Sequence, residues 1–259
     1  MSREMIKMII TDLDQTLLRD DGSVSDYTRS IWRECKRRGI VTGIATARLE
    51  ANAVQIQEDL GADLLICSNG SKVIFRGEMI QCDMMDEETV QGLTAALCAL
   101  PSQTEILVET GRGLFINTHR FAPSHPLGKA EFTDFSKGIR QQASQIYASI
   151  GQEREAQVIC GRFAKCRCLH YRDSVRYAFM AEQVSKERAI IRTAQQLDIP
   201  LSMTAAFGDD EGDRQMLSLC GLGVAVDNAL PGVKEMADAV AKSNQEDGVA
   251  RFIEQKILH

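Results

Sequence analysis

The segment Asp12-Leu13-Asp14-Gln15-Thr16-Leu17-Leu18 directly follows an apolar run over residues 5–10, which only a lysine at position 7 interrupts. A run of this kind is typical of a strand buried on both faces of a parallel sheet. Ligands bind at the carboxyl ends of such strands, so the two aspartates are placed to line a crevice there. Aspartate is also common in ordinary turns, so this segment alone does not separate a site from a turn.

The residues around this segment alternate between strand and helix patterns. We expect strands over residues 5–10, 40–45 and 63–67, and helices over residues 26–38 and 49–60. Ser25 suits the N-cap of the first helix, and Gly39 and Gly61 lie just beyond the two helix ends. The alternation implies right-handed crossovers and a doubly wound α/β core with a mostly parallel sheet.

The pattern changes after residue 70 and returns near residue 186. Between them we expect hairpins over 72–82 and 105–117, a helix over 87–100, irregular structure over 119–138, and strands near 166–171 and 175–180. Beyond them we expect helices over 186–197, 213–219 and 232–236, with Ser185 as the first N-cap, and strands over 204–207, 223–226 and 239–241. The chain therefore divides into an α/β core domain, residues 1–81 and 182–259, and an inserted α+β domain, residues 82–181.

A second acidic segment, Gly208-Asp209-Asp210-Glu211-Gly212-Asp213, also follows an expected strand and opens an expected helix. If the two strands are neighbours, several carboxylates meet at one sheet edge, where their repulsion requires protons, cations or a metal. Hard oxygen ligands suit Mg²⁺, which keeps waters and a substrate phosphate in its shell. The preference of helix N-termini for acidic residues explains one or two of these side chains, but not two clusters in matching positions.

Two further positions are suited to an anion. The segment Ala45-Thr46-Ala47-Arg48 lies where the second strand meets the second helix, and a hydroxyl with backbone N–H groups binds anions there. Lys186 lies in the first turn of its helix, where its charge opposes the helix dipole unless an anion is bound. Taken alone, Thr46 would be an ordinary N-cap and Lys186 a solvated lysine.

In this order, the four segments resemble the haloacid dehalogenase (HAD) superfamily of phosphotransferases. The resemblance spans almost the whole chain, and the insertion between Thr46 and Lys186 corresponds to a C2-type cap on a Rossmann-like core. Further segments are similar to the Cof-type, IIB branch of the superfamily: Cys67-Ser68-Asn69-Gly70, Val184-Ser185-Lys186, Val226-Asp227-Asn228-Ala229 and Asp247-Gly248-Val249-Ala250.

The resemblance implies an Mg²⁺-dependent phosphatase that hydrolyses small phosphate monoesters, in particular sugar phosphates, through an aspartyl-phosphate. Asp12 would be the nucleophile, and Asp14 the general acid and base. The cap would close over the core, exclude water and select the leaving group. The implied metal ligands are Asp12, Asp14 through its backbone carbonyl, Asp209 and Asp213, and the implied phosphate or substrate contacts are Thr46, the amide of Ala47, Arg48, Asn69 and Lys186.

The chain departs from the pattern of the branch at two positions. Gly212 stands where the branch usually has Asn, and Ala47 stands where Gly is common. The amide of Ala47 survives, but Gly212 removes a polar side chain near the expected metal and phosphate. Two alternatives stay open: a phosphomutase of the same superfamily, which would use the same Asp12, and a phosphometabolite-binding or regulatory protein with weakened catalysis, for which Gly212 is the only support in the sequence.

Composition limits the cellular location and the binding partners that we expect for this protein. The 259 residues fit one large or two modest domains, and the net charge of −6 argues against a broad nucleic-acid surface. The N-terminus has no signal-peptide pattern, no apolar run approaches the ~20 residues of a membrane helix, and the scattered cysteines suit reduced thiols. We expect a cytoplasmic protein that acts on a small phosphorylated metabolite and binds neither nucleic acid nor membrane, either as a monomer or as a homodimer.

Two groups of residues in the inserted domain have open interpretations. A basic group either attracts a phosphorylated substrate or forms a solvated strand face: Arg162, Lys165, Arg167, Arg172 and Arg176. A second group contains the residue types of a zinc site but lacks the Cys-x2-Cys spacing, so small buried hydrophobes are the favoured interpretation: Cys160, Cys166, Cys168 and His170.

Overall fold

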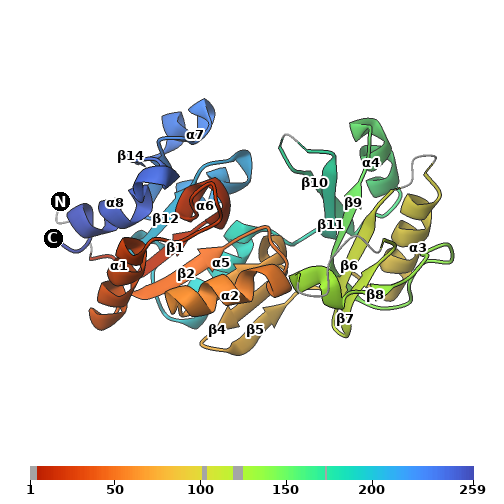
Figure 1. Ribbon diagram of the computed structural model, residues 1–259, viewed down its shortest axis with the longest axis horizontal. Helices are drawn as coiled ribbons and strands as arrows, with labels where there is room; N and C mark the ends of the chain where they lie inside the picture. The colour runs from red at the N-terminus through yellow and green to blue at the C-terminus, as the bar shows by residue number, and fades with distance from the viewer. Residues whose placement is uncertain (1–4, 101–103, 119–124, 173) are drawn as a thin grey trace. The chain divides into compact units, whose positions relative to one another are not determined.

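A computed structural model describes residues 5–100, 104–118, 125–172 and 174–259 (Figure 1). The chain forms two compact units, which we call the core unit, Met1–Gln81 with Ser185–His259, and the inserted unit, Cys82–Val184. The sequence-based division places the second boundary at 181/182, whereas the structure places it at 184/185.

The core unit is built on an eight-stranded sheet in the order β14-β13-β12-β1-β2-β3-β4-β5. Neighbouring strands from β14 to β3 are parallel, and β4 runs antiparallel to β3. A two-residue turn at Arg76 and Gly77, both with positive φ, joins β4 to β5 as a hairpin of the type that matches strand twist. The bounds are β1 Met8–Thr11, β2 Val41–Ala45, β3 Leu64–Cys67, β4 Lys72–Phe75, β5 Glu78–Cys82, β12 Thr204–Gly208, β13 Leu222–Val226 and β14 Ala239–Ala241.

Helices cover both faces of this sheet. The strand order runs one way from β1 to β3 and the other way from β12 to β14, so right-handed crossovers place α1 and α2 on one face of the sheet and α6 on the other. In agreement, α1 packs against α2 and α8, whereas α6 packs against α5 and α7. The bounds are α1 Asp26–Arg37, α2 Glu50–Leu60, α5 Lys186–Gln196, α6 Arg214–Leu219, α7 Pro231–Met236 and α8 Gly248–Lys256. The predicted doubly wound α/β class is confirmed.

The predicted helix caps are also confirmed in the core unit. Ser25 accepts a hydrogen bond from the N–H of Thr28 at 3.0 Å, and Ser185 accepts one from the N–H of Arg188 at 3.3 Å. Gly61 ends α2 in the left-handed conformation, with φ of 64°. Such caps satisfy backbone groups that a helix end would otherwise leave without partners.

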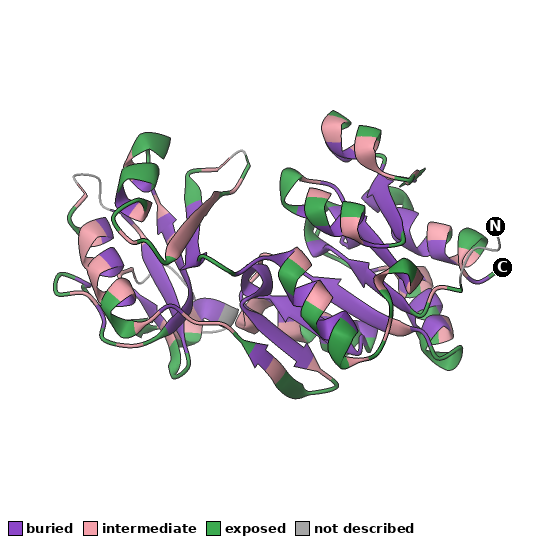
Figure 2. Cartoon of the chain, turned by 180° about the vertical axis from the view of Figure 1, so that it is seen from behind, coloured by how far each residue is buried: buried purple, intermediate pink, exposed green. Residues whose placement is uncertain are grey.

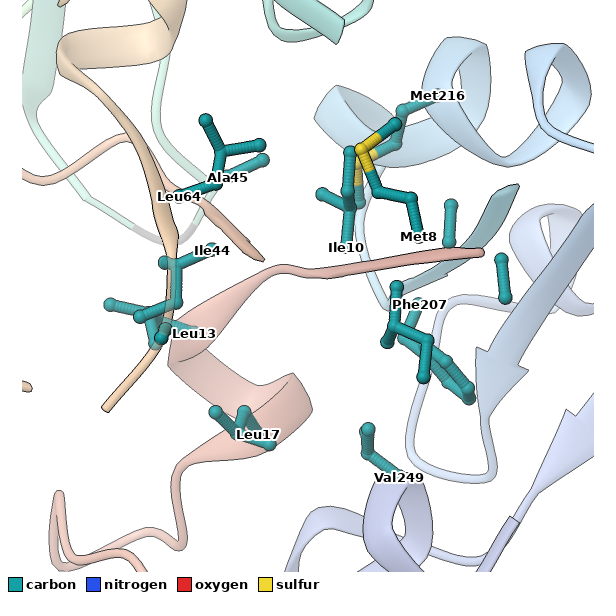
Figure 3. Packing of buried hydrophobic residues seen from close by; sticks show 14 of the residues in the cluster. Met8, Ile10, Leu13, Leu17, Ile44, Ala45, Leu64, Phe207, Met216 and Val249 are labelled. Carbon is teal, nitrogen blue, oxygen red and sulfur yellow. The ribbon is translucent and has the colours of Figure 1, made fainter. Parts of the chain in front are cut away.

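The strand before the first acidic segment lies at the centre of the apolar core. Met8 and Ile10 are fully buried, and Figure 3 shows them in the cluster that also contains Phe207 from β12. Leu13 and Leu17, from the turn after β1, belong to the same cluster. Each buried side chain of this size contributes about 1.5–3 kcal/mol. Packing therefore holds the segment on both sides of Asp14, which itself is exposed. Figure 2 shows the strands of the core sheet mostly in the colour of buried residues.

The inserted unit has its own sheet, in the order β10-β11-β9-β6-β7-β8, with helices α3 and α4. Neighbouring strands of this sheet are antiparallel except β7 and β8, which are parallel, and α3 packs against β6, β9 and α4. A separate apolar cluster fills this unit, as expected for an α+β domain. The bounds are α3 Glu87–Cys98, β6 Ile106–Thr110, β7 Gly113–Ile116, β8 Glu131–Phe132, β9 Ala143–Ser149, α4 Glu153–Cys160, β10 Cys166–His170 and β11 Arg176–Ala181.

Among the α-helices and the strands of more than two residues that the structure describes, three were not expected from the sequence. They are the central strand β9 and the helix α4 of the inserted unit, and the helix α8 of the core unit. The short strand β8 lies within the stretch expected to be irregular, of which residues 119–124 fall outside the described residues.

Candidate active site

The ends of neighbouring strands bring the predicted polar residues to one edge of the core sheet. Asp12 follows β1, Thr46 follows β2 and Asp209 follows β12. The N–H of Asp12 donates to the carbonyl of Phe207 at 2.9 Å, which fixes the end of β1 against β12. Asn69, just after β3, donates its N–H to the carbonyl of Thr46 at 3.2 Å. The parallel order β12-β1-β2-β3 therefore assembles a polar edge centred on Asp12.

Lys186 joins two of the carboxylates at this edge. Its Nζ lies 2.6 Å from Oδ1 of Asp12 and 2.8 Å from Oδ1 of Asp213. The side chains of all three residues are buried, so the pairs are shielded from water. Lys186 is therefore not the solvated surface lysine that its position alone would suggest.

Asp213 has a structural partner for each of its oxygens. Oδ1 accepts from Lys186, and Oδ2 accepts the backbone N–H groups of Asp209 at 3.0 Å and Asp210 at 3.2 Å. Gly208 permits this arrangement, because a Cβ at that position would lie 2.5 Å from the Cβ of Asp213. The turn after β12 is thus folded around one carboxylate.

Thr16 is a site residue to which the sequence analysis gave no role. Its hydroxyl donates to Oδ1 of Asp209 at 2.6 Å, between residues 193 positions apart in the chain. The signal was present in the Asp-x-Asp-x-Thr spacing at residues 12–16. This bond holds the carboxylate of Asp209, which lies within 4.8 Å of those of Asp12 and Asp213.

Burial dominates the electrostatics of the cluster. Burial raises the pKa of Asp12 well above its usual value, Lys186 opposes this rise, and the nearby carboxylates of Asp213 and Asp209 add to it. Burial also raises the pKa of Asp209 to about 6, against the hydrogen bond from Thr16. Burial disfavours the charge on Lys186, but attraction to Asp12 and Asp213 outweighs it and raises its pKa. Lys186 therefore stays protonated, and the carboxylates need further positive charge.

A divalent cation fits this need. Among the described residues, Asp12, Asp209 and Asp213 form the one group of three or more His, Cys, Asp or Glu whose ligand atoms lie within 4.8 Å of one another. Three buried carboxylates face a single buried ammonium, so negative charge is left uncompensated. An all-oxygen donor set of this kind suits Mg²⁺.

Asp14 is held apart from the three buried carboxylates. Its side chain is 57% exposed and forms a two-point ion pair with Arg48, with Nη2 to Oδ1 at 2.6 Å and Nε to Oδ2 at 2.9 Å. The following residue, Gln15, has φ of 59°, which turns the chain sharply here. Arg48, predicted to contact substrate, thus contacts Asp14 in this structure.

The remaining predicted phosphate contacts lie beside this pair. Thr46 is buried, and its hydroxyl accepts the N–H of Arg48 at 3.1 Å, so the hydroxyl hydrogen can donate to an anion. Ala47 is half-buried and Asn69 is buried. These groups line the strand edge between β2 and β3, next to Asp12.

The inserted unit holds the two groups that the sequence left with two interpretations, the cysteines with His170 and the basic residues. In the part of the chain that the structure describes, no three of the cysteine and histidine side chains meet the ligand spacing above, although the Sγ atoms of Cys160 and Cys166 lie 4.0 Å apart. Arg167 donates to the carbonyl of Val184 at 3.0 Å. The other basic residues are exposed, and they are Arg162, Lys165, Arg172 and Arg176.

None of the described helices is both long and apolar enough to cross a membrane.

Comparisons with known proteins agree with this geometry. The family described as haloacid dehalogenase-like hydrolase matches residues 9–253. Phosphatase YwpJ of Bacillus subtilis is 28% identical, over 96% of this chain and 99% of its own length. The 5-amino-6-(5-phospho-D-ribitylamino)uracil phosphatase YcsE of the same organism is 25% identical, over 98% and 96%. A solved haloacid dehalogenase-like hydrolase from Bacteroides thetaiotaomicron has a TM-score of 0.83 at 22% identity, over 96% and 99%.

Proposed function

The chain belongs to the haloacid dehalogenase-like hydrolase family and is a phosphatase, and on this premise we propose that it hydrolyses small phosphate monoesters with Mg²⁺ through an aspartyl-phosphate on Asp12. The superfamily resemblance expected from the motifs is confirmed. The contact of Lys186 with both Asp12 and Asp213 carries the proposal, because it places a cation and an anionic nucleophile where a phosphoryl group would meet them.

Asp12 is the proposed nucleophile. Its Oδ1 binds Lys186, and the second oxygen attacks phosphorus. A bond forms between this oxygen and phosphorus while the bond from phosphorus to the leaving oxygen breaks. Water then attacks the phosphorus of the aspartyl-phosphate, which returns the Asp12 carboxylate and releases inorganic phosphate.

Positive charge is essential for this step, because an anionic nucleophile approaches an anionic phosphate. Asp12, Asp209, Asp213 and the backbone carbonyl of Asp14 would hold the Mg²⁺ ion. When bound, the ion supplies charge neutralisation for the carboxylate and the phosphoryl oxygens. Lys186 and the N-terminus of α5, where it lies, add further positive charge at this edge of the sheet.

Thr46, the amide of Ala47 and Lys186 are the proposed phosphoryl contacts, with Arg48 and Asn69 on the substrate side. Phosphoryl transfer is mostly positioning and charge stabilisation, so donors on rigid elements matter more than covalent chemistry. Thr46 meets this condition, since its N–H donates to the carbonyl of Ile66 at 2.8 Å and so fixes the end of β2 against β3.

Asp14 is the proposed general acid and base. It would donate a proton to the leaving oxygen and then accept one from the attacking water. In this structure the Arg48 guanidinium occupies both carboxylate oxygens of Asp14. The ion pair therefore has to open, at least at one oxygen, before Asp14 can carry the proton.

We further propose that sugar phosphates or related metabolites are the substrates, and that the inserted unit, residues 82–181 in the sequence-based division, acts as a cap and selects the leaving group. The relative YcsE is named for a phosphorylated ribityl compound, which is a sugar-alcohol phosphate. Selection by an inserted domain leaves the phosphoryl chemistry on the core unit unchanged.

The test measures phosphate release from 4-nitrophenyl phosphate and a panel of sugar phosphates, with Mg²⁺ and with EDTA. Wild type should release phosphate only with the metal, and Asp12→Asn should not. Asp59→Asn, an exposed aspartate on α2, is the matched control and should keep full activity. Asp14→Asn with radiolabelled substrate should accumulate acid-stable protein-bound phosphate that Asp12→Asn lacks.

Each remaining outcome overturns part of the proposal. Release that persists in EDTA excludes the metal role, and bound phosphate that persists in Asp12→Asn excludes this nucleophile. Movement of phosphate within a sugar without release indicates the phosphomutase. Tight binding of sugar phosphates without turnover indicates the binding protein.

A further inference from the structure

The loop that carries Asp14 is fixed from outside by two loops distant in sequence. After β1 the chain turns so that the N–H of Leu18 donates to the carbonyl of Leu13 at 2.8 Å. Within this turn, Gln15 has φ of 59°. A residue other than Gly is strained in this conformation, so other contacts must maintain it.

Asn228, in the turn after β13, supplies one such contact. Its Nδ2 donates to the backbone carbonyl of Gln15 at 2.6 Å, and its Oδ1 accepts the backbone N–H of Asn244 at 3.0 Å. Asn228 is exposed, yet both ends of its short side chain are used. The residue thus ties the carbonyl one position after Asp14 to a third loop.

Asn244 holds the other end of the same turn. It is buried, and its Nδ2 donates to the carbonyl of Leu18 at 3.0 Å and to Oδ1 of Asp20 at 3.1 Å. Three residues later, Asp247 accepts from Arg19 at 2.8 Å. Bonds at residues 18, 19 and 20 therefore attach the turn directly to the segment around Asn244, and the bond at residue 15 attaches it through Asn228.

The position of Asn228 makes its bond important for Asp14. The carbonyl of Gln15 belongs to the peptide directly after the strained residue, so anchoring it fixes the backbone torsions of Gln15. Loss of the bond lets Gln15 relax toward negative φ, and this relaxation rotates the preceding peptide and the side chain of Asp14. Apolar packing of Leu13 and Leu17 holds the ends of the turn but not its exposed middle.

We propose that Asn228 is a positioning residue for Asp14, acting through its hydrogen bond to the carbonyl of Gln15. This inference rests on the proposed role of Asp14 as general acid and base. Asn228 touches neither the three buried carboxylates nor Lys186 in the bonds described above. The peptide before Gln15 also carries the Asp14 carbonyl, a proposed Mg²⁺ contact, so the effect on proton transfer is measured at saturating Mg²⁺.

Dependence on the leaving group tests this role. A 4-nitrophenolate leaves readily without a proton, whereas an alkoxide from a sugar or alkyl phosphate needs one. We expect Asn228→Ala to lower kcat/KM, which reports phosphoryl transfer to Asp12, by roughly 10- to 100-fold for an alkyl phosphate and by less than about threefold for 4-nitrophenyl phosphate. Hydrolysis of the aspartyl-phosphate is common to both substrates, so the losses are compared in kcat/KM and not in kcat. Asn228→Asp keeps the acceptor for Asn244 but loses the donor to Gln15, so it should behave like Asn228→Ala.

Asp238→Ala in the core unit is the matched control. Asp238 is exposed like Asn228, and its side chain accepts the backbone N–H of Gly223 at 2.8 Å, near the start of the strand that Asn228 follows. Loss of stability alone should therefore be similar in both variants, as thermal unfolding would measure. The control should not make the rate more sensitive to the leaving group.

A double variant separates this inference from the proposed function. In an Asp14→Asn background, Asn228→Ala should have little further effect, because the group that it positions is absent. Equal losses for both substrates in Asn228→Ala, or additive losses in the double variant, overturn the positioning role. If Asp14→Asn itself shows no preference for the better leaving group, the proposed acid role of Asp14 fails instead.

Discussion

Nζ of Lys186 lies 2.6 Å from Oδ1 of Asp12, although 174 positions separate the two residues in the chain. The whole inserted unit lies between them in sequence, so this contact forms only when both segments of the core unit are folded together. An unpaired charge in a buried site is costly, and each group removes this cost for the other. The same contact therefore stabilises the fold and prepares the nucleophile.

Lys186→Met should damage stability and activity together. It keeps the apolar part of the side chain but leaves Asp12 and Asp213 buried without their cation. We expect the free energy of unfolding in EDTA at pH 7.5 to fall by about 3–5 kcal/mol, and kcat/KM to fall by at least about 100-fold. Urea unfolding and phosphate release measure the two effects. Lys256→Met, an exposed lysine at the end of α8, should change stability by no more than about 0.5 kcal/mol.

The apparent affinity for Mg²⁺ should fall in acid. Burial raises the pKa of Asp209 to about 6, and a carboxylate must lose its proton to bind the metal. The affinity is therefore complete well above pH 6 and is lost as the pH falls through 6. Competition by this single proton predicts about tenfold weaker binding at pH 5 than at pH 7.5, and the raised pKa of Asp12 adds to the effect. Activity titrated with Mg²⁺ at the two pH values checks this, and equal affinities would contradict it.

Much of this site follows from the sequence because its residues lie at strand ends. The apolar runs before Asp12 and Asp209 predict buried strands, and a parallel sheet brings their carboxyl ends to one edge. The sequence does not show which side chains pair at this edge. The hydrogen bond from Thr16 to Asp209 and the ion pair of Arg48 with Asp14 depend on side-chain torsions at turns.

The inserted unit is less predictable for a physical reason. Strand β9 contains Ser144, Gln145 and Ser149 among its apolar residues, so its composition does not separate it from a loop, and neighbours on both sides stabilise it. Helix α4 has only eight residues, too few for a clear helical period. Helix α8 begins after Asp247, which has φ of 57° and forms no side-chain cap hydrogen bond, so the usual signal of a helix start is missing.

Gly212→Asn should be tolerated by the fold. A Cβ at Gly212 meets no heavy atom within 4 Å, whereas a Cβ at Gly208 would lie 2.5 Å from that of Asp213. We expect Gly212→Asn to change the free energy of unfolding by less than about 1 kcal/mol. We also expect it to raise phosphatase activity, because it returns a polar side chain near the proposed metal and phosphate site. Gly208→Ala should instead lower stability and metal-dependent activity, since Asp213 has to move. Thermal unfolding and Mg²⁺ titration of both variants measure this contrast.

Gly70→Ala should displace the start of α5 and with it Lys186. Gly70 has φ of 101°, and a Cβ there would overlap the carbonyl oxygen of Ser185, the residue before Lys186. Gly77→Ala is the matched control, because Gly77 has φ of 87° but no atom within 4 Å of its Cβ position. Backbone strain alone, in Gly77→Ala, should cost about 1–2 kcal/mol, and Gly70→Ala should cost more and also lower kcat/KM. Equal stability losses with full activity in both variants would show that Gly70 serves the turn and not the position of Lys186.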